Sequence, residues 1–243
     1  MKFNADVGES FGVWSMGNDE ALMPHIDMAN VACGGHASDP VTMQRTVRLA
    51  KTQGVTVGAH PSYPDLLGFG RRPLSIPHAE AAVHMLAQVG ALVAIAAMED
   101  TAVTYVKPHG ALYNCMMDDP DLMAALMRAL AESKLGLPLM VLGTQDHQKH
   151  AAMAETIGVS LLFEAFADRR YTPQGRLQSR SIEGSVYHDA SQILEQAERI
   201  ITEGTIIASD GSVLKMPVDA LCVHGDNEES IRTVKQFRAF LSV

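Results

Sequence analysis

Residues 103–114 read Val-Thr-Tyr-Val-Lys-Pro-His-Gly-Ala-Leu-Tyr-Asn. The β-branched and aromatic residues at 103–106 predict a buried strand, which ends abruptly at the sequence Lys107-Pro108-His109-Gly110. Pro108 has no backbone N–H for a sheet and holds the preceding residue extended, while Gly110 permits a sharp exit. We therefore expect Lys107 and His109 to project from a fixed backbone at the tip of a strand.

The same order, an apolar run followed by Gly, His and an acidic residue, recurs along the chain. Further strands are predicted at 3–7, 26–33, 55–59, 138–143, 159–167 and 219–223, and helices at 41–53, 75–97, 121–134, 145–156, 190–203 and from 227 to about 241. Residues 205–216 predict a hairpin with a type I′ turn at Asp210-Gly211. This alternation predicts a parallel sheet with right-handed crossovers.

The seven strands are more naturally closed than open, because polar residues at each strand tip then converge on one mouth. A chain of 243 residues with 47% apolar residues is long enough for one barrel with one core. The predicted fold is therefore an irregular seven-stranded (β/α) barrel forming a single domain over residues 1–243.

The composition limits the kinds of binding partner and the cellular compartment that suit this chain. A net charge of −9 without long basic clusters argues against nucleic acids and anionic membranes, and favours a small molecule or a protein. Three cysteines form no C-x-x-C motif and cannot all pair, which suits a reducing cytoplasm. The apolar run 81–98 contains His84 and Gln88, so a core-facing helix is expected rather than a membrane span.

The predicted mouth gathers ionisable residues from separate strand tips. A single histidine is more often structural than functional, but four histidines at four strand ends indicate a site. The candidates are Asp6, Glu9, His36, His60, Lys107, His109, Glu164, Asp168, His224 and Asp226.

Three uses of this cluster remain open. Asp6, His36 and His60 could hold a divalent metal, although no tight local metal motif is present. Without a metal, Asp6 or Glu9 could act as base and His109 or His224 as acid. Lys107 could stabilise an oxyanion or bind a substrate carboxylate, or it could simply pair with Glu164.

Arginine doublets follow two of the strand tips. An Arg fork recognises carboxylate or phosphate, so Arg71 and Arg169 are candidate binding residues, whereas surface ion pairing would account for one member of each doublet. The sequence contains no G-x-x-x-x-G-K-[ST] and no G-x-S-x-G motif. A Walker-type nucleotide site and an α/β-hydrolase nucleophile are therefore excluded.

Several blocks together resemble the LamB/YcsF family. They are Asn4-Ala-Asp-Val-Gly-Glu9, Ala32-Cys-Gly-Gly-His36, Gly58-Ala-His-Pro-Ser-Tyr-Pro-Asp65 with Gly68-Phe-Gly-Arg71, Val106-Lys-Pro-His-Gly-Ala-Leu-Tyr-Asn114, Glu164-Ala-Phe-Ala-Asp-Arg169 and Cys222-Val-His-Gly-Asp226. These blocks run in order along the whole chain and are long enough to be specific.

The resemblance implies a barrel akin to that of the polysaccharide deacetylases. It also implies ATP-dependent opening of 5-oxo-L-proline to L-glutamate, with cleavage of ATP to ADP and phosphate, together with 5-oxoprolinase subunits B and C. In that reaction the catalytic candidates are Asp6, Glu9, Lys107, His109, His224 and Asp226, and the substrate- or phosphate-binding candidates are Arg71, Tyr113, Glu164, Asp168 and Arg169.

Mg-ATP would be a co-substrate, bound in a non-Walker manner or by a partner chain. Two other functions stay open. One is a metal-dependent, deacetylase-like amide hydrolase that uses Asp6, His36 and His60. The other is a non-catalytic, ligand-binding subunit.

Overall fold

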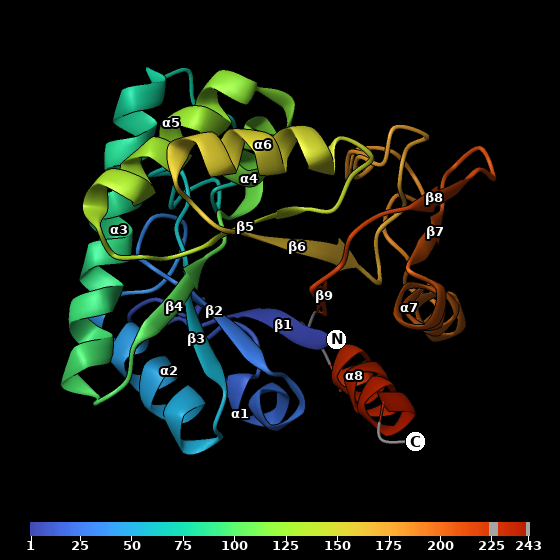
Figure 1. The fold of residues 1–243 in the computed structure, drawn as a ribbon. Helices are drawn as coiled ribbons and strands as arrows, with labels where there is room; N and C mark the ends of the chain where they lie inside the picture. Colours follow the sequence, from blue (N-terminus) through green and yellow to red (C-terminus); the bar gives the residue numbers. More distant parts are fainter. Residues whose placement is uncertain (224–227, 242–243) are drawn as a thin grey trace.

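A computed structural model describes residues 1–223 and 228–241. Seven parallel strands close into a barrel in the order β1 (Lys2–Val7), β2 (Met28–Ala32), β3 (Thr56–His60), β4 (Val103–Val106), β5 (Leu139–Leu142), β6 (Leu161–Phe166) and β9 (Ala220–Cys222). Strand β9 pairs in parallel with both β6 and β1 and so completes the ring. The predicted closed barrel is confirmed (Figure 1).

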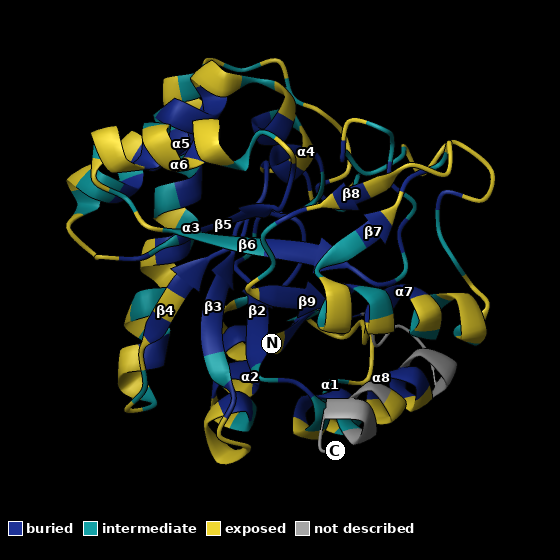
Figure 2. Cartoon of the chain, turned by 45° about the vertical axis from the view of Figure 1, so that its right-hand side comes forward, coloured by how far each residue is buried: buried dark blue, intermediate teal, exposed yellow. Residues whose placement is uncertain are grey.

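Helices surround this ring. They are α1 (Asp19–Leu22) with the 3-10 turn Met23–His25, α2 (Pro40–Thr52), α3 (His78–Met98), α4 (Gly110–Asp118), α5 (Pro120–Ser133), α6 (His147–Ile157), α7 (Ala190–Glu203) and α8 (Glu228–Leu241). Figure 2 shows the strands buried in the middle and the outer helix faces exposed. The main core lies between the barrel wall and the helices.

Two helix starts follow the expected chemistry. The carboxylate of Asp39 accepts hydrogen bonds from the backbone N–H groups of Val41 and Thr42, and Pro40 is the first residue of α2. Asp119 caps α5 in the same way, and Pro120 follows it. An N-cap carboxylate satisfies N–H groups that lack a partner inside the helix.

The sequence pattern did not predict helix α4. A sharp exit was expected at Gly110 and no element was predicted between it and residue 121, but Gly110 takes a φ of +57° and turns the chain directly into a helix. Two successive helices therefore connect β4 to β5, and the cap at Asp119 separates them. As a result, α4 begins at the barrel mouth and carries Tyr113 into it.

The predicted hairpin forms from β7 (Thr205–Ile207) and β8 (Val213–Lys215), but its predicted turn type is wrong. A type I′ turn needs positive φ at both central residues. Among the described residues Gly211 has a φ of +86°, whereas Asp210 is not one of the positive-φ residues. Gly211 N–H donates to the Ala208 carbonyl, and the Asp210 carboxylate instead accepts from Ser212 N–H. The loop is longer than a two-residue turn.

Helix α3 passes the length and hydropathy test for a membrane span, and it is the one helix of the described chain that does so. One face, however, is buried through Met85, Val89 and Leu92. This face packs against the barrel wall, and α3 also contacts α2 and α5. The expectation of a core-facing helix is confirmed.

Side chains on β1 alternate between the outer core and the interior of the barrel. Phe3, Ala5 and Val7 belong to the outer core, while Asn4 and Asp6 point the other way, into the barrel. There the Asn30 amide donates to Asn4 Oδ1 and Asp6 Oδ1, each at 2.8 Å, and Tyr105 donates to Asn30 Oδ1 at 2.6 Å. A buried hydrogen-bonded layer therefore supports the residues at the mouth.

Candidate active site

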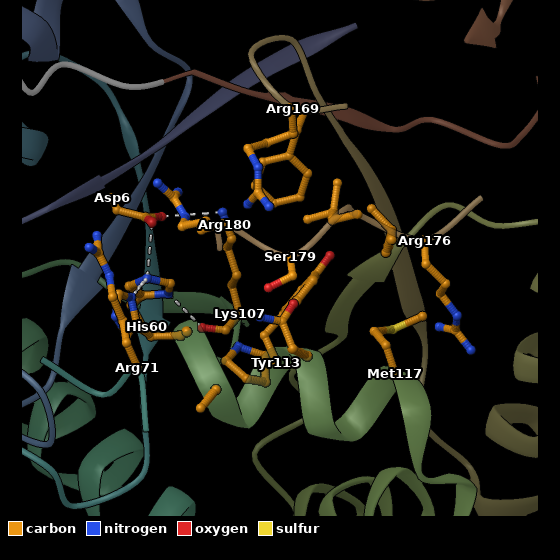
Figure 3. A pocket seen from close by; sticks show the side chains of 18 of the residues that line it. Asp6, His60, Arg71, Lys107, Tyr113, Met117, Arg169, Arg176, Ser179 and Arg180 are labelled. Carbon is orange, nitrogen blue, oxygen red and sulfur yellow. Dashed lines mark hydrogen bonds and ion pairs between the residues drawn. The ribbon is translucent and has the colours of Figure 1, made fainter. Parts of the chain in front are cut away.

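A cavity of about 460 Å³ opens at the carboxyl ends of the strands (Figure 3). It brings together residues that are far apart in the sequence. Eight predicted site residues line it: Asp6, Glu9, His60, Arg71, Lys107, His109, Tyr113 and Arg169. The convergence that a closed parallel barrel requires at this end is present.

The remaining candidates lie elsewhere. His36 sits behind the cavity wall, where it contacts Glu9, and Glu164 is buried beneath the cavity beside Lys107. Asp168 follows β6 but does not line the cavity. His224 and Asp226 lie outside the described residues.

Lys107 stands at the floor of the cavity and is almost fully buried. Its Nζ lies 3.0 Å from Glu164 Oε2 and 3.2 Å from Asp6 Oδ1, and it donates to Asn4 Oδ1 at 3.1 Å. Burial alone lowers the pKa of Lys107, but the charges of its neighbours, including the two carboxylates, hold that pKa well above its usual value. Lys107 is therefore a fixed ammonium ion. The ion pair with Glu164 is formed, and Lys107 still lines the cavity.

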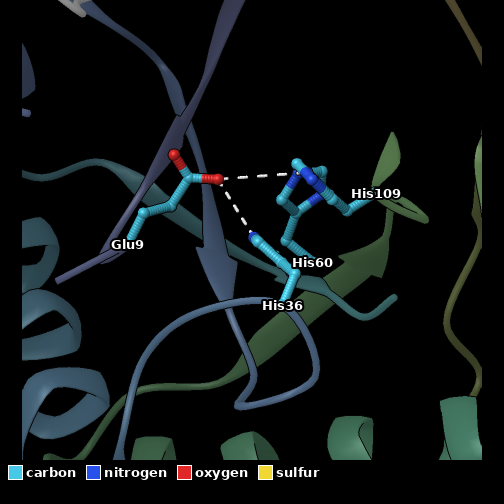
Figure 4. A group of neighbouring side chains, drawn as sticks. All are labelled: Glu9, His36, His60 and His109. Atoms are coloured by element: carbon cyan, nitrogen blue, oxygen red, sulfur yellow. Dashed lines mark hydrogen bonds and ion pairs between the residues drawn. The ribbon is translucent and has the colours of Figure 1, made fainter. Parts of the chain in front are cut away.

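A second group of side chains joins the cavity from the ends of β1, β2, β3 and β4 (Figure 4). Each of Glu9, His36, His60 and His109 offers one donor atom, and these atoms all lie within 4.8 Å of one another. His36 Nε2 is 3.0 Å from Glu9 Oε1, and the His36 and His109 rings stack with centroids 3.7 Å apart.

The hydrogen bonds of two of these histidines fix their tautomers. A carbonyl oxygen only accepts, so His60 Nδ1 donates to Lys107 O at 2.7 Å, and His109 Nε2 donates to Phe69 O at 3.0 Å. In the neutral rings, the other nitrogens, His60 Nε2 and His109 Nδ1, then both carry lone pairs, although they lie 3.0 Å apart. A proton or a metal ion is needed between them.

Burial favours neutral rings in this cluster. Burial, followed by the nearby His60, lowers the pKa of His36 well below its usual value, and burial, followed by His36 and His60, does the same for the pKa of His109. Neutral imidazoles are the form that binds metal ions. His36 Nδ1 is also buried with no hydrogen-bond partner in the described part of the chain.

Three imidazoles and one carboxylate suit a divalent ion such as Zn²⁺, Mn²⁺, Fe²⁺ or Ni²⁺. The predicted metal set contained Asp6, His36 and His60. The structure gathers both of these histidines with Glu9 and His109. Asp6 Oδ2 lies 3.2 Å from His60 Nε2, so Asp6 is placed between this cluster and Lys107.

The arginine doublet after β3 divides as expected. Arg72 pairs with Asp65 and holds the loop after β3. Arg71 stays at the cavity, with its guanidinium 5.1 Å from the centre of the Phe69 ring. One arginine of the doublet is therefore structural and the other faces the site.

Sequence reasoning missed the residues that the segment after Tyr171 contributes. Arg176, Gln178, Ser179 and Arg180 all line the cavity. The polar composition of 172–189 marked this segment as irregular, but no local pattern indicated that it folds back over the mouth. Asn4 could have been identified as part of the site from the sequence, because a polar residue that alternates with Asp6 on the first strand is not needed for packing.

The chain is similar to known proteins over its whole length. The LamB/YcsF family profile matches residues 1–243. A protein of Chromohalobacter salexigens, named as the A-subunit of 5-oxoprolinase, is 53% identical over 235 residues, which cover 97% of this chain and 94% of that protein. A Pseudomonas putida protein with the same name and the number 2 is 50% identical over 238 residues, covering 98% and 92%.

Solved structures are also similar to this chain in fold. A lactam utilization protein from Thermus thermophilus superposes with a TM-score of 0.91 at 37% identity, covering all of this chain and 97% of that one. A putative cellobiose-phosphate cleavage protein from Enterococcus faecalis V583 reaches a TM-score of 0.53 at 12% identity over 97% of this chain and 94% of that one, and shares the fold alone. By sequence over its full length, the chain belongs to the LamB/YcsF family.

Proposed function

We propose that this chain is the ring-opening component of an ATP-dependent 5-oxoprolinase, which converts 5-oxo-L-proline to L-glutamate while ATP is cleaved to ADP and phosphate. One observation carries the proposal. A chain about half identical to proteins named as the A-subunit of 5-oxoprolinase places a carboxylate, a buried ammonium ion and an imidazole cluster around one cavity.

The chemistry explains why ATP is needed. The lactam of 5-oxoproline is an unstrained amide stabilised by resonance, so water attacks it slowly and its opening gains little free energy. Phosphorylation of the amide oxygen would supply the driving force. The groups around the cavity would then have to activate water, stabilise negative charge and protonate the departing nitrogen.

Asp6 is the residue that we assign to water activation. Its carboxylate lines the cavity and contacts both His60 and Lys107. Lys107 Nζ faces the same cavity with its charge held by Glu164, so it would stabilise a developing oxyanion. In a metal-free cluster, the proton that His109 shares with His60 would be the one delivered to the ring nitrogen.

The cluster also fits a metal ion, and Glu9, His36, His60 and His109 would hold it. When bound, a divalent ion would polarise a carbonyl oxygen and lower the pKa of a bound water. In that case Asp6, which touches His60 and lines the cavity, would accept the proton of the attacking water.

We place the nucleotide on a partner chain. The sequence has no Walker motif. The relatives are named as one lettered subunit of their enzyme, and we propose that subunits B and C handle Mg-ATP. Phosphate would then reach the cavity of this chain as part of an activated substrate.

Reconstitution tests the proposal. The purified chain is mixed with subunits B and C, 5-oxo-L-proline and Mg-ATP, and glutamate is measured by chromatography. We expect glutamate only when this chain is present, and a strong loss of it with Asp6→Asn. Full turnover without this chain would overturn the assignment, and normal turnover with Asp6→Asn would make the chain a non-catalytic, ligand-binding subunit.

The imidazole cluster favours one other function, a metal-dependent amide hydrolase of the deacetylase kind that needs no ATP. Hydrolysis of an N-acetylated sugar by the isolated chain, lost with EDTA and restored by a divalent metal, would support that function. ATP-dependent glutamate formation with no deacetylation supports the oxoprolinase instead.

A further inference from the structure

Two chemically different groups of residues line the cavity. Asp6, Glu9, His60 and His109 come from the ends of β1, β3 and β4, and the arginines Arg169, Arg176 and Arg180 come from the chain after β6. In Figure 3, Arg176 lies across the drawn pocket from Arg71, and Lys107 lies between them. The proposed reaction steps use the first group together with Lys107. They assign no step to the arginines that follow β6.

Arg169 is the buried one of these arginines, with 6% of its surface exposed. Its Nη2 donates to Gln178 O at 2.6 Å, while its Nε is buried without a hydrogen-bond partner in the described part of the chain. The Gln196 amide donates to the carbonyls of Phe166, Ala167 and Arg169, and so fixes the backbone at this strand tip. The guanidinium is therefore held in place with a donor left unused.

The segment after Tyr171 brings further hydrogen-bond donors to the cavity. Tyr171 and Leu177 form an antiparallel bridge, and Gln178 N–H donates to the Arg170 carbonyl at 2.9 Å. This pairing folds the segment back over the mouth. Arg176 Nη1 is buried without a hydrogen-bond partner among the described residues. Arg176 Nε lies 3.8 Å from Asp118 Oδ1, which is longer than a hydrogen bond.

Two of the positive charges are neighbours. Arg180 lines the same cavity, and after burial its charge is a main reason why the pKa of Arg169 lies below its usual value. Two neighbouring guanidinium groups, one of them with a buried donor unused, are complementary to an anion of more than one charge. A carboxylate is matched by a single Arg fork, whereas a phosphoryl group carries nearly two charges and three acceptor oxygens.

We propose that Arg169 and Arg180 form a subsite for a phosphoryl group. During turnover the group would be the one transferred from ATP and carried into the cavity on the substrate, so this part of the inference rests on the proposed function. Binding of inorganic phosphate to the subsite does not require turnover.

Calorimetric titration of the isolated chain with inorganic phosphate tests the subsite. We expect saturable binding that weakens as salt is raised. Arg180→Met should weaken it about tenfold or more, because it removes a charge-assisted hydrogen bond. Arg180 is exposed, so its replacement leaves the fold intact. Arg128→Met, an exposed position on α5 away from the cavity, is the matched control.

The outcomes separate the two proposals. Phosphate binding that Arg180→Met weakens, without glutamate formation by the reconstituted enzyme, would support the subsite and remove the proposed function. Glutamate formation with no phosphate binding, or with Arg180→Met behaving as Arg128→Met, would overturn the subsite. Titration with ATP is the third arm. Tighter binding of ATP than of phosphate, lost in the same variant, would also overturn it, because the site would then be a nucleotide site.

Discussion

His60 Nε2 and His109 Nδ1 face each other at 3.0 Å, and the second nitrogen of each ring donates to a backbone carbonyl. When the rings are neutral, both facing nitrogen atoms therefore carry lone pairs. A metal ion resolves this conflict with four donors already in place, whereas a proton resolves it by charging a buried ring.

We expect protein purified without chelators to contain a divalent metal at close to one ion per chain. His109→Ala and His36→Ala should lower the metal content sharply, because each removes one of four donors. Elemental analysis measures this without any assay of activity. His84→Ala, an exposed histidine on α3, is the control and should keep its metal. Wild-type protein that neither retains nor takes up metal would leave the shared proton as the explanation.

The backbone that supports this cluster makes a second prediction. Gly70 has a φ of +61°, and a Cβ there would lie 2.8 Å from His36 Cβ and 2.9 Å from His109 Cδ2. We expect Gly70→Ala to cost about 1–2 kcal/mol in the free energy of unfolding through backbone strain alone. It should also displace both rings and so lower metal affinity. Urea denaturation and metal titration measure the two effects.

Gly90→Ala is the matched control for Gly70→Ala. Gly90 lies in helix α3, and a Cβ there would meet nothing within 4 Å. Alanine should therefore stabilise the protein by about 0.5–1 kcal/mol, since glycine is the poorer helix former. Equal effects of the two substitutions would contradict the steric account of Gly70.

Part of the arrangement of residues at the barrel mouth could be predicted from the sequence, for a physical reason. Strand tips such as Lys107-Pro108-His109-Gly110 carry their signal locally, in residues that end a strand and turn the chain. Parallel strands that close into a ring must bring those tips together, so Asp6, His60, Lys107 and His109 could be placed at one mouth before any coordinates were known.

Other parts depend on contacts that no local pattern encodes. Which carboxylate joins the histidines is decided by how the loop after β1 packs, and the structure gives Glu9 where Asp6 was expected. The fold of the segment that carries Arg176 and Arg180 depends on backbone pairing between Tyr171 and Leu177. Helix α4, the first helix after β4, was hidden because His109-Gly110 has the residues of a turn but enters a helix.

Acid stability supplies a third prediction, at Asp39. Its carboxylate accepts from the N–H groups of Gly12, Val41 and Thr42, and these hydrogen bonds lower its pKa to about 2. A group whose pKa is lowered by folding stabilises the protein above its unfolded pKa, and that contribution is lost as the pH falls through the folded pKa. The loss should therefore fall between about pH 4 and pH 2.

Substitution at Asp39 isolates that contribution. Asp39→Asn keeps a capping oxygen but does not titrate, so its unfolding free energy should change less than that of the wild type over this pH range. Asp39→Ala should cost about 1 kcal/mol at pH 7 through loss of the cap. Urea denaturation at a series of pH values measures both. A wild type and an Asn variant with parallel pH profiles would mean that other carboxylates dominate.

The last prediction concerns the buried charges beneath the cavity. Glu164 is fully buried, and Lys107 Nζ is 3.0 Å from its Oε2. Lys107→Met leaves the Glu164 and Asp6 carboxylates without their ammonium partner, and we expect it to cost about 3–5 kcal/mol in the free energy of unfolding. Adding Glu164→Gln removes the stranded buried charge, so the double variant should be more stable than Lys107→Met alone. The double-mutant cycle by urea denaturation gives the coupling energy.

An exposed ion pair is the control for this buried one. Lys149→Met breaks the exposed pair with Asp146 and should leave stability nearly unchanged. Both variants that lack Lys107 should lose ring opening, because Lys107 is the member of the buried pair that lines the cavity. A stable and fully active Lys107→Met protein would therefore contradict both the structural and the catalytic role given to this ammonium ion.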